Sequence, residues 1–272
     1  MANDSAVVTL DSLKEHRHSF RKLGFSKISG FLPLDYIHYL ESCVDDIIDQ
    51  FKSASSEMEE AVVSYGSSWI FLENIFRYSD DLRTVLSAGP LVDLASFFLE
   101  ADDVQLLRDQ TYYKIGPAQE TPWHQDGLFV PDDNLKSVTF WIPFHNIDQS
   151  MSPMSYVNGS HHWCYLGDML DRFHDFNTFE AVLKTQGMNI TTFDSLLCGD
   201  LLIHDTWAMH GTPAMLPNSS RKAIVLVYAK SPIQLNSVNE LPSCHRNLRA
   251  QASVIRQANK ISFHNTLKCY ER

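Results

Sequence analysis

The feature that most constrains the fold is a change in the character of the sequence near residue 104. From there to about residue 230, short β-rich segments are separated by turn residues, without an internal repeat or a low-complexity linker. The four clearest segments are residues 104–114, 137–147, 200–205 and 222–228. This pattern predicts a mainly β fold of the sandwich or double-sheet jelly-roll type.

Helical patterns occupy the N-terminal third of the chain. Residues 9–23 read as a helix that ends before Gly24, and residues 80–100 as a helical region interrupted at Gly89-Pro90. Between them, a helix after Pro33 carries apolar residues at helical spacing, namely Ile37, Leu40, Val44, Ile47, Ile48 and Phe51. Residues 62–71 read as a strand. We expect one domain, residues 1–272, comprising mostly helical support packed on one sheet (1–103), a β core (104–230) and a C-terminal extension (231–272).

Composition and charge favour a globular protein that acts on a small molecule. A chain of 272 residues with 44% hydrophobic content can bury a sizeable core. Its 22 Lys and Arg against 33 Asp and Glu give a net charge of -11, which disfavours binding to nucleic acid or to an anionic membrane. Five cysteines without C-x-x-C spacing indicate reduced thiols. With no export signal and no run of about 18 apolar residues, we expect a cytoplasmic protein without a membrane span. No pattern indicates an oligomeric state.

The candidate metal ligands begin with His124 and Asp126 in the stretch Thr121-Pro122-Trp123-His124-Gln125-Asp126-Gly127. In an extended segment, side chains two apart point to the same side. A distant second histidine would complete a 2-His-1-carboxylate set, which leaves adjacent positions open on a ferrous ion. His210 is a suitable partner, and Arg221 follows eleven positions later. A His-x-Asp pair alone is more often a surface pair, so the prediction depends on the combination with His210, Arg221 and Gly199-Asp200.

Other polar residues are less specific. Arg108, Gln110, Tyr112 and Lys114 would share one face of the strand 104–114, either lining a pocket or forming a satisfied structural cluster. The histidines interpreted as loop or core residues are His161, His162, His174 and His204, of which His204 could support the metal ligands. Trp207 suits packing or a pocket wall equally well.

The motifs together resemble the phytanoyl-CoA dioxygenase family. They are His124-Gln125-Asp126 after Trp123, Trp141 in the following strand, Asn158-Gly159-Ser160-His161, Gly199-Asp200, His210-Gly211-Thr212 and the stretch 218–224, and they occur in the family's order. The resemblance covers about residues 10 to 230. It implies an Fe(II)- and 2-oxoglutarate-dependent oxygenase on a double-stranded β-helix, a cupin-like jelly roll. One loop departs from the family: Ser150-Met151-Ser152-Pro153-Met154 stands where many members have Asn-Gly-x-Leu, so the substrate-side loop is not transferred.

Residue roles follow from this resemblance. It implies three iron ligands, His124, Asp126 and His210. Arg221 and Thr212 would hold the distal carboxylate of 2-oxoglutarate, which an arginine grips bidentately. Trp141 would lie beside the cosubstrate, and Tyr112 and Gln110 are further candidates for the pocket wall. Related halogenases have Gly or Ala at the position of Asp126, so the carboxylate favours hydroxylation.

The implied reaction hydroxylates a small metabolite with O2 while 2-oxoglutarate is decarboxylated to succinate and CO2, and ascorbate is expected to help in vitro. Arg108, Lys114 and Lys136 favour an anionic or zwitterionic substrate. Alternatives are desaturation or cyclisation with the same cofactors, a non-catalytic metal- or 2-oxoglutarate-binding sensor, and a zinc hydrolase. The aromatic-rich segment 149–192 reads as a lid. Part of it, together with residues after Asp126 such as Phe129, is expected to be mobile without ligand and to become ordered when 2-oxoglutarate and substrate bind.

Overall fold

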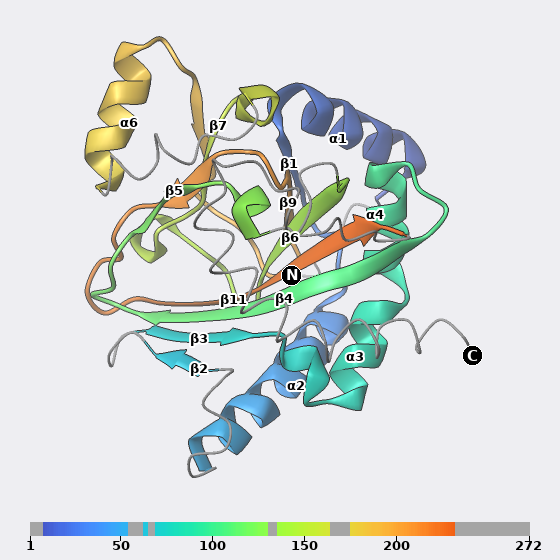
Figure 1. Ribbon diagram of the computed structural model, residues 1–272. Coiled ribbons are helices and arrows are strands. Elements are labelled where there is room, and N and C mark those ends of the chain that lie inside the picture. The colour runs from blue at the N-terminus through green and yellow to red at the C-terminus, as the bar shows by residue number, and fades with distance from the viewer. Residues whose placement is uncertain (1–7, 54–61, 65–68, 130–134, 164–174, 232–272) are drawn as a thin grey trace, which may run out of the picture.

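Two antiparallel sheets form the centre of the protein (Figure 1). The computed structural model describes residues 8–53, 62–64, 69–129, 135–163 and 175–231. The larger sheet has the strand order β1-β9-β6-β11-β4-β3-β2, and the smaller has the order β5-β10-β7-β8. Within the described residues, no strand pairing closes the two sheets into a barrel. The predicted double-sheet, cupin-like jelly roll with flanking helices is confirmed.

The strands of the larger sheet come from both halves of the chain. They are β1 (Phe25–Ile28), β2 (Val62–Ser64), β3 (Trp69–Glu73), β4 (Val104–Ile115), β6 (Ser137–Pro143), β9 (Leu201–Asp205) and β11 (Ser220–Lys230). The smaller sheet contains β5 (Thr121–His124), β7 (Ser155–Val157), β8 (Ile190–Thr192) and β10 (His210–Thr212). The long strands β4 and β11 pair in antiparallel register from Ile115 and Ser220 to Val104 and Lys230. This ladder forms one wall of the pocket between the sheets.

The helices begin and end close to the predicted positions. They are α1 (Leu10–Leu23), α2 (Leu34–Ser53), α3 (Asp80–Ser87), α4 (Pro90–Leu99) and α6 (Phe176–Thr185). Helix α1 begins after Thr9, whose hydroxyl accepts a hydrogen bond from the backbone N–H of Ser12, and ends at Gly24 with φ of 89°. No single described helix is long and apolar enough to cross a membrane, and the bent pair α3 and α4 meets that test only when the two are joined.

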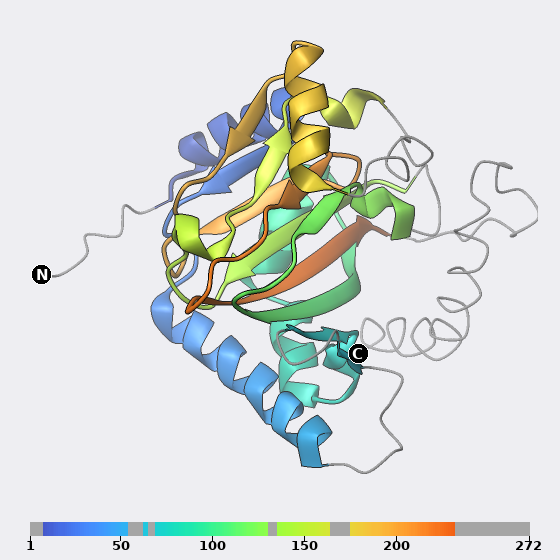
Figure 2. The same ribbon diagram turned by 90° about the vertical axis from the view of Figure 1, so that its left-hand side faces the viewer.

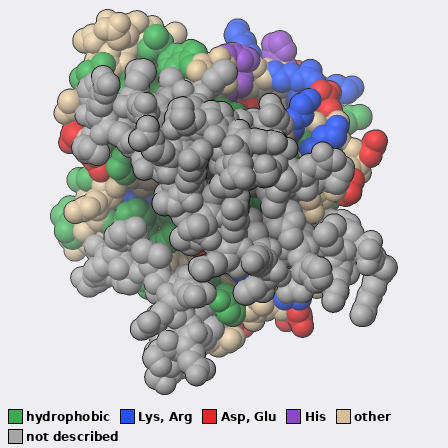
Figure 3. All heavy atoms as spheres, viewed as in Figure 1, with side chains coloured by type: hydrophobic (Ala, Val, Ile, Leu, Met, Phe, Trp, Pro, Cys, Tyr) green, Lys and Arg blue, Asp and Glu red, His purple; other side chains and the backbone are tan. Residues whose placement is uncertain are grey.

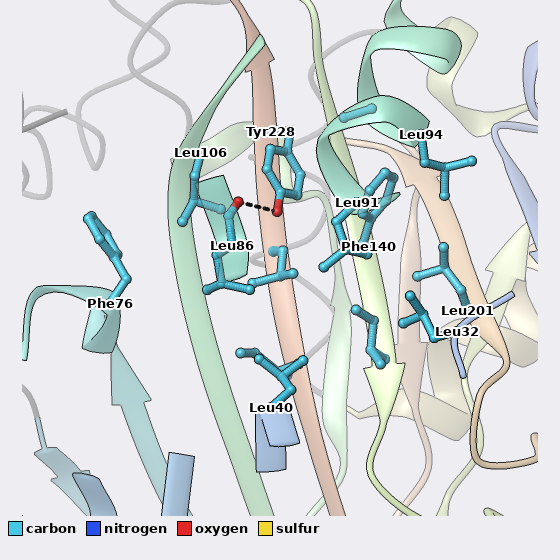
Figure 4. Close-up of a cluster of buried hydrophobic side chains, with 14 of the residues drawn as sticks. Leu32, Leu40, Phe76, Leu86, Leu91, Leu94, Leu106, Phe140, Leu201 and Tyr228 are labelled. Atoms are coloured by element: carbon cyan, nitrogen blue, oxygen red, sulfur yellow. Dashed lines mark hydrogen bonds between the residues drawn. The ribbon is translucent and has the colours of Figure 1, made fainter. Parts of the chain in front are cut away.

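The alternation of side chains along the strands separates a helix-facing core from a pocket-facing surface. On β11, Ile224, Leu226 and Tyr228 pack with the helices, whereas Ala223 and Val225 belong to the cluster between the sheets. Figure 4 shows the helix-facing side, where the Tyr228 hydroxyl donates to the Leu86 carbonyl at 2.8 Å. Each large apolar side chain buried in this way stabilises the fold by about 1.5–3 kcal/mol.

Two predicted strands have different bounds in the structure. The stretch 62–71 contributes two strands, β2 and β3, on either side of residues 65–68, which lie outside the described residues. The stretch 137–147 pairs only as far as Pro143, and Ile147 makes an isolated bridge to Leu196. Proline has no backbone N–H to donate, which is consistent with the end of the ladder there.

The expected lid at 149–192 is largely part of the fold. It supplies strands β7 and β8 and helix α6, which stands at the top left of Figure 1. Phe176 and Phe179 are buried beside Trp123, because these aromatic residues form the core behind the smaller sheet. The described residues 149–163 and 175–192 are therefore elements of the packed fold and not a simple excursion over the pocket, and the ordering of part of this segment on ligand binding stays a prediction. Residues 164–174 with His174, the Phe129 side chain and the extension beyond residue 231 lie outside the described part of the chain.

Candidate metal and cosubstrate site

Two adjacent strands of the smaller sheet carry the two candidate histidines. His124 ends β5 and His210 begins β10, and the two residues are directly paired in the antiparallel register. The sequence suggested that Asp126 continues the strand. In the structure it instead begins a short 3₁₀ turn, Asp126–Phe129. The backbone N–H of Gly127 donates to the Thr206 carbonyl at 2.6 Å and fixes this turn.

The turn also depends on glycine at position 127. A Cβ atom there would lie 2.7 Å from the Trp207 ring, closer than side chains approach one another. Trp207 therefore packs against the segment that carries Asp126, and the Gln125 amide donates to the Trp207 carbonyl at 2.8 Å. Of the two interpretations of Trp207, the structure supports packing.

The three side chains meet at one point between the sheets. Candidate ligand atoms of His124, Asp126 and His210 all lie within 4.8 Å of one another. Asp126 Oδ1 is 3.7 Å from His124 Nε2 and 3.8 Å from His210 Nε2. The Nδ1 atoms of His124 and His210 lie 2.8 and 2.9 Å from the backbone carbonyls of Pro122 and Ala208. Because a carbonyl only accepts, Nδ1 carries the proton and Nε2 presents its lone pair to the cluster.

The charges of the cluster suit a divalent cation. Burial, with a smaller contribution from the other histidines nearby, lowers the pKa of His124 and of His210 to about 4. Burial alone would raise the pKa of Asp126, but His210 and the hydrogen-bonded His204 outweigh it, and the pKa lies well below its usual value. At neutral pH the site therefore offers two neutral imidazoles and one carboxylate, the protonation states that metal binding requires.

A chain of hydrogen bonds orients the Asp126 carboxylate. Its Oδ2 accepts from Thr139 Oγ1 at 2.9 Å and from His204 Nε2 at 3.1 Å, and His204 Nδ1 accepts from the Tyr156 hydroxyl at 3.1 Å. Oδ1 therefore remains directed at the two histidines. The sequence suggested a supporting role for His204. For Tyr156 it offered no signal, because a tyrosine in a three-residue strand is indistinguishable from core.

The pocket continues from these residues toward Arg221 on β11. Its walls are formed by Gln110, Tyr112, Thr121, His124, Asp126, Trp141, Met154, His204, His210, Gly211, Thr212, Arg221 and Val225. Arg221 is buried beside the Trp141 ring, with its guanidinium carbon 5.8 Å from the ring centroid, and one of its terminal nitrogens donates to the Ser152 carbonyl. Among the described residues, Arg221 Nε and Thr212 Oγ1 are buried without a hydrogen-bond partner. Unsatisfied buried polar atoms are costly, so this end of the pocket suits a polar ligand.

Gln110 and Tyr112 line the same pocket, and their polar atoms also form hydrogen bonds with neighbouring side chains. The Tyr112 hydroxyl donates to Gln110 Oε1 at 3.1 Å, and Gln110 Nε2 donates to Glu73 Oε1 at 2.6 Å. Arg108 joins them through Gln110 Oε1 at 3.2 Å. The polar face predicted on the strand 104–114 is thus present. Gln110 and Tyr112 both line the pocket and belong to a hydrogen-bonded cluster.

Other residues from the sequence prediction lie elsewhere. Lys136 borders a separate groove between the helices and the start of β6, so it does not join Arg108 and Lys114. His161 Nε2 donates to the Arg21 carbonyl at 3.1 Å, which attaches the short turn Ser160–Trp163 to α1. Figure 3 shows histidine side chains at the surface beside Lys and Arg side chains in this region. His161 and His162 are loop residues, as expected.

A jelly roll that brings two neutral imidazoles, one carboxylate and a buried arginine into one pocket has the groups that an iron- and 2-oxoglutarate-dependent oxygenase needs. The profile of the phytanoyl-CoA dioxygenase (PhyH) family matches residues 20–223. The chain belongs to this family, and the resemblance seen in its motifs is confirmed. No curated protein matches the sequence.

Solved structures of similar fold cover most of the chain. The non-heme α-ketoglutarate-dependent epimerase SnoN from nogalamycin biosynthesis is 15% identical, with a TM-score of 0.63 over 86% of this chain and 93% of that one. The carbocyclase SnoK from the same biosynthesis is 17% identical, with a TM-score of 0.64 over 80% and 84%. EctD from S. alaskensis, crystallised with 2-oxoglutarate and 5-hydroxyectoine, is 17% identical, with a TM-score of 0.64 over 89% and 84%. At these identities the likeness establishes the fold.

Proposed function

We propose that this oxygenase hydroxylates a small-molecule metabolite, with His124, Asp126 and His210 as iron ligands and Arg221 as the residue that binds 2-oxoglutarate. The observation that carries the proposal is the juxtaposition of two sites in one pocket. Asp126 Oδ1 and the two histidine Nε2 atoms converge at one end, and the unpartnered polar atoms of Arg221 and Thr212 lie at the other. An oxygenase of this class must hold a metal and a dicarboxylate side by side.

The residues present fit Fe(II). Imidazole nitrogen and carboxylate oxygen are ligands that ferrous iron accepts, and three protein ligands leave positions for the oxo acid and dioxygen. When bound, the iron would supply the oxidation chemistry that couples the decarboxylation of 2-oxoglutarate to succinate and CO2 with oxidation of the substrate. Asp126 contributes the negative charge that offsets part of the metal charge. The Nδ1–H groups of both histidines donate to backbone carbonyls, so the Nε2 atoms keep their lone pairs free for the metal.

The remaining residues position the cosubstrate. Arg221 can form a charge-assisted pair with its distal carboxylate, and Thr212 Oγ1 can donate a hydrogen bond to the same group. Trp141 closes one side, and Tyr112 and Gln110 close another. Because Arg221 and Thr212 are both buried, these interactions take place away from bulk water, where charge pairing is stronger.

The proposed substrate is small and either anionic or zwitterionic. Lys136 borders a different groove, so the support comes from Arg108, whose Nη1 lies 3.5 Å from Glu73 Oε1 and whose positive charge acts on His124. Arg108 and Glu73 both form hydrogen bonds with Gln110, which lines the pocket, so a positive and a negative group stand behind this wall for a molecule that carries both charges.

Turnover of 2-oxoglutarate tests the proposal. Purified protein with Fe(II) and ascorbate is supplied with a panel of charged metabolites, and succinate and the product masses are measured. We expect one class of metabolite to stimulate succinate formation and to gain one oxygen atom. A product mass that is lower than the substrate mass by two hydrogen atoms would instead indicate desaturation or ring closure. Binding of 2-oxoglutarate without any turnover would favour a sensor, and activity with zinc alone a hydrolase.

The hydrogen-bond chain behind Asp126 leads to a further prediction. His204→Leu removes a donor to Oδ2, so the carboxylate is held by Thr139 alone and loses orientation. We expect Fe(II) affinity, measured by competition with a chelator, to fall about 10–100-fold, as when outer partners of metal ligands are lost. Tyr156→Phe should have a smaller effect because His204 still donates to Asp126. The exposed Tyr39→Phe is the control, and wild-type affinity in His204→Leu would refute a positioning role.

A further inference from the structure

Lys114 is a buried cation beside the pocket, and the proposed function gives it no role. It lies on β4 and is fully buried. Its Nζ donates to Thr121 Oγ1 at 2.8 Å and to the Gln119 carbonyl at 3.1 Å, and it lies 4.1 Å above the Trp69 ring. A long charged side chain is rarely buried completely unless a partner of opposite charge is present.

Lys114 and Arg221 are direct neighbours across the β4–β11 ladder. Residues opposite one another in an antiparallel pair project from the same face of the sheet, so both side chains lie on the pocket side. In the described part of the chain, neither forms an ion pair with a carboxylate. Two adjacent buried positive charges without a counter-ion are unfavourable, and an anion bound between the sheets would relieve this repulsion.

The charged groups that face Lys114 are Arg221 on β11 and Glu120 just before β5. Glu120 is engaged elsewhere, because its Oε1 accepts the backbone N–H of Phe176 at 2.7 Å. Burial first, and Arg221 second, lower the pKa of Lys114 to about 7, and Glu120 acts in the opposite direction. The positive form of Lys114 is therefore disfavoured before an anion binds.

Thr121 connects Lys114 to the pocket. Its hydroxyl oxygen accepts the hydrogen from Lys114, so its own O–H is free to donate in another direction. Thr121 lines the pocket, and the β5–β10 register places it opposite Thr212. Two threonine hydroxyls thus flank the end of the pocket that contains Arg221.

We propose that Lys114 and Thr121 complete the site for the distal carboxylate of the cosubstrate, with Lys114 supplying a second positive charge and orienting the Thr121 hydroxyl as a donor. This inference rests on the proposed function, in which Arg221 and Thr212 bind that carboxylate. Lys114 acts through Thr121 and through its charge, so it is a positioning residue.

Proton uptake on cosubstrate binding is the expected consequence. A carboxylate favours the protonated amine, so binding raises the pKa of Lys114 from about 7. Between the free and the bound pKa, the protein takes up a proton as 2-oxoglutarate binds. The sign is therefore a loss of affinity with rising pH, approaching about tenfold per unit for a full proton. The two candidate histidine ligands have pKa values near 4 and do not titrate in this range.

The experiment is calorimetric titration of the Fe(II)-loaded protein with 2-oxoglutarate, without oxygen, at pH 8 in two buffers of different ionisation enthalpy. The wild type is expected to take up a substantial fraction of a proton. Lys114→Met keeps the length and packing of the side chain and is expected to bind at least tenfold more weakly at pH 6.5, with no uptake at pH 8. Thr121→Val should weaken binding and retain uptake, because the amine and its charge remain. Lys14→Met, at an exposed lysine on α1, is the matched control.

The outcomes separate this inference from the proposed function. If the wild type does not bind 2-oxoglutarate, both fail. If it binds without proton uptake, or if Lys114→Met binds with unchanged affinity and uptake, this inference alone is overturned and Lys114 has only a structural role. The wild-type measurement does not require a variant, so it decides the question even if Lys114→Met does not fold.

Discussion

Replacement of His124 or His210 by alanine is expected to abolish Fe(II) binding and all turnover of 2-oxoglutarate while the fold survives. Each imidazole provides one of three candidate ligand atoms that lie within 4.8 Å of one another. Loss of a ligand should reduce iron affinity by more than the ~10–100-fold that follows loss of an outer partner. The core is formed by apolar side chains of the sheets and helices, not by the metal, so the circular dichroism spectrum should be unchanged.

Asp126→Ala should lose iron binding and stability together. Its Oδ2 is the acceptor for Thr139 and His204, so alanine would leave two buried donors unsatisfied, at a cost of about 1–3 kcal/mol for each group. Asp126→Asn retains the shape but not the charge and should separate the two effects. Thermal unfolding and bound iron are measured on the same samples.

The control for the histidine variants is His162→Ala, at an exposed histidine outside the cluster. It should bind iron and turn over cosubstrate like the wild type. If His124→Ala, Asp126→Ala and His210→Ala all bound iron with wild-type affinity, the assignment of the metal site would be wrong.

The sequence was sufficient where the signal is periodic or carried by rare combinations of residues. The apolar residues at helical spacing from Ile37 to Ile48 predicted α2, and each of these residues is buried. The strand 104–114 was predicted with its polar face, because alternation is a local property. The three candidate ligands and Arg221 were predicted from their spacing and from the family resemblance, and the structure brings all four side chains into one pocket.

What the sequence could not predict depends on contacts between distant segments. Asp126 reaches the histidines through a 3₁₀ turn that is fixed by Thr206 and Trp207, some 80 positions away. The aromatic residues of α6 resembled a lid because their partner, Trp123, lies in another strand. Lys136 and Lys114 were equivalent as basic residues near the motif, and only the sheet pairing places Lys114 opposite Arg221.

Arg221→Leu should be the most selective way to remove the cosubstrate. The guanidinium is buried, and burial lowers its pKa to about 10, which still leaves it charged at neutral pH. Truncating one partner of a buried charged pair costs about 2–5 kcal/mol, so 2-oxoglutarate affinity should fall between about 30-fold and several thousand-fold. Thr212→Ala removes one neutral donor and should cost about 1 kcal/mol.

The stability of the ligand-free Arg221→Leu protein provides a second readout. Without an anion, the buried charge and the unpartnered Nε are unfavourable, and this offsets the loss of the hydrogen bond to the Ser152 carbonyl, so an apolar side chain of similar volume should change the melting temperature little. Added 2-oxoglutarate should raise the melting temperature of the wild type and not that of the variant, because only bound ligand stabilises the folded state. Iron binding through His124, Asp126 and His210 should persist in the variant.

Arg221→Lys distinguishes charge from geometry at this position. Lysine keeps the positive charge but cannot form the two parallel hydrogen bonds of a guanidinium, so its affinity for 2-oxoglutarate should lie between those of the wild type and Arg221→Leu. Arg83→Leu, on the surface of α3, is the control for loss of an arginine. Equal 2-oxoglutarate affinity in wild type and Arg221→Leu would contradict the assignment, and the unpartnered Nε would then have to serve a different anion. Binding lost equally in Arg221→Leu and Arg221→Lys would instead show that the paired hydrogen bonds, and not the charge, select the carboxylate.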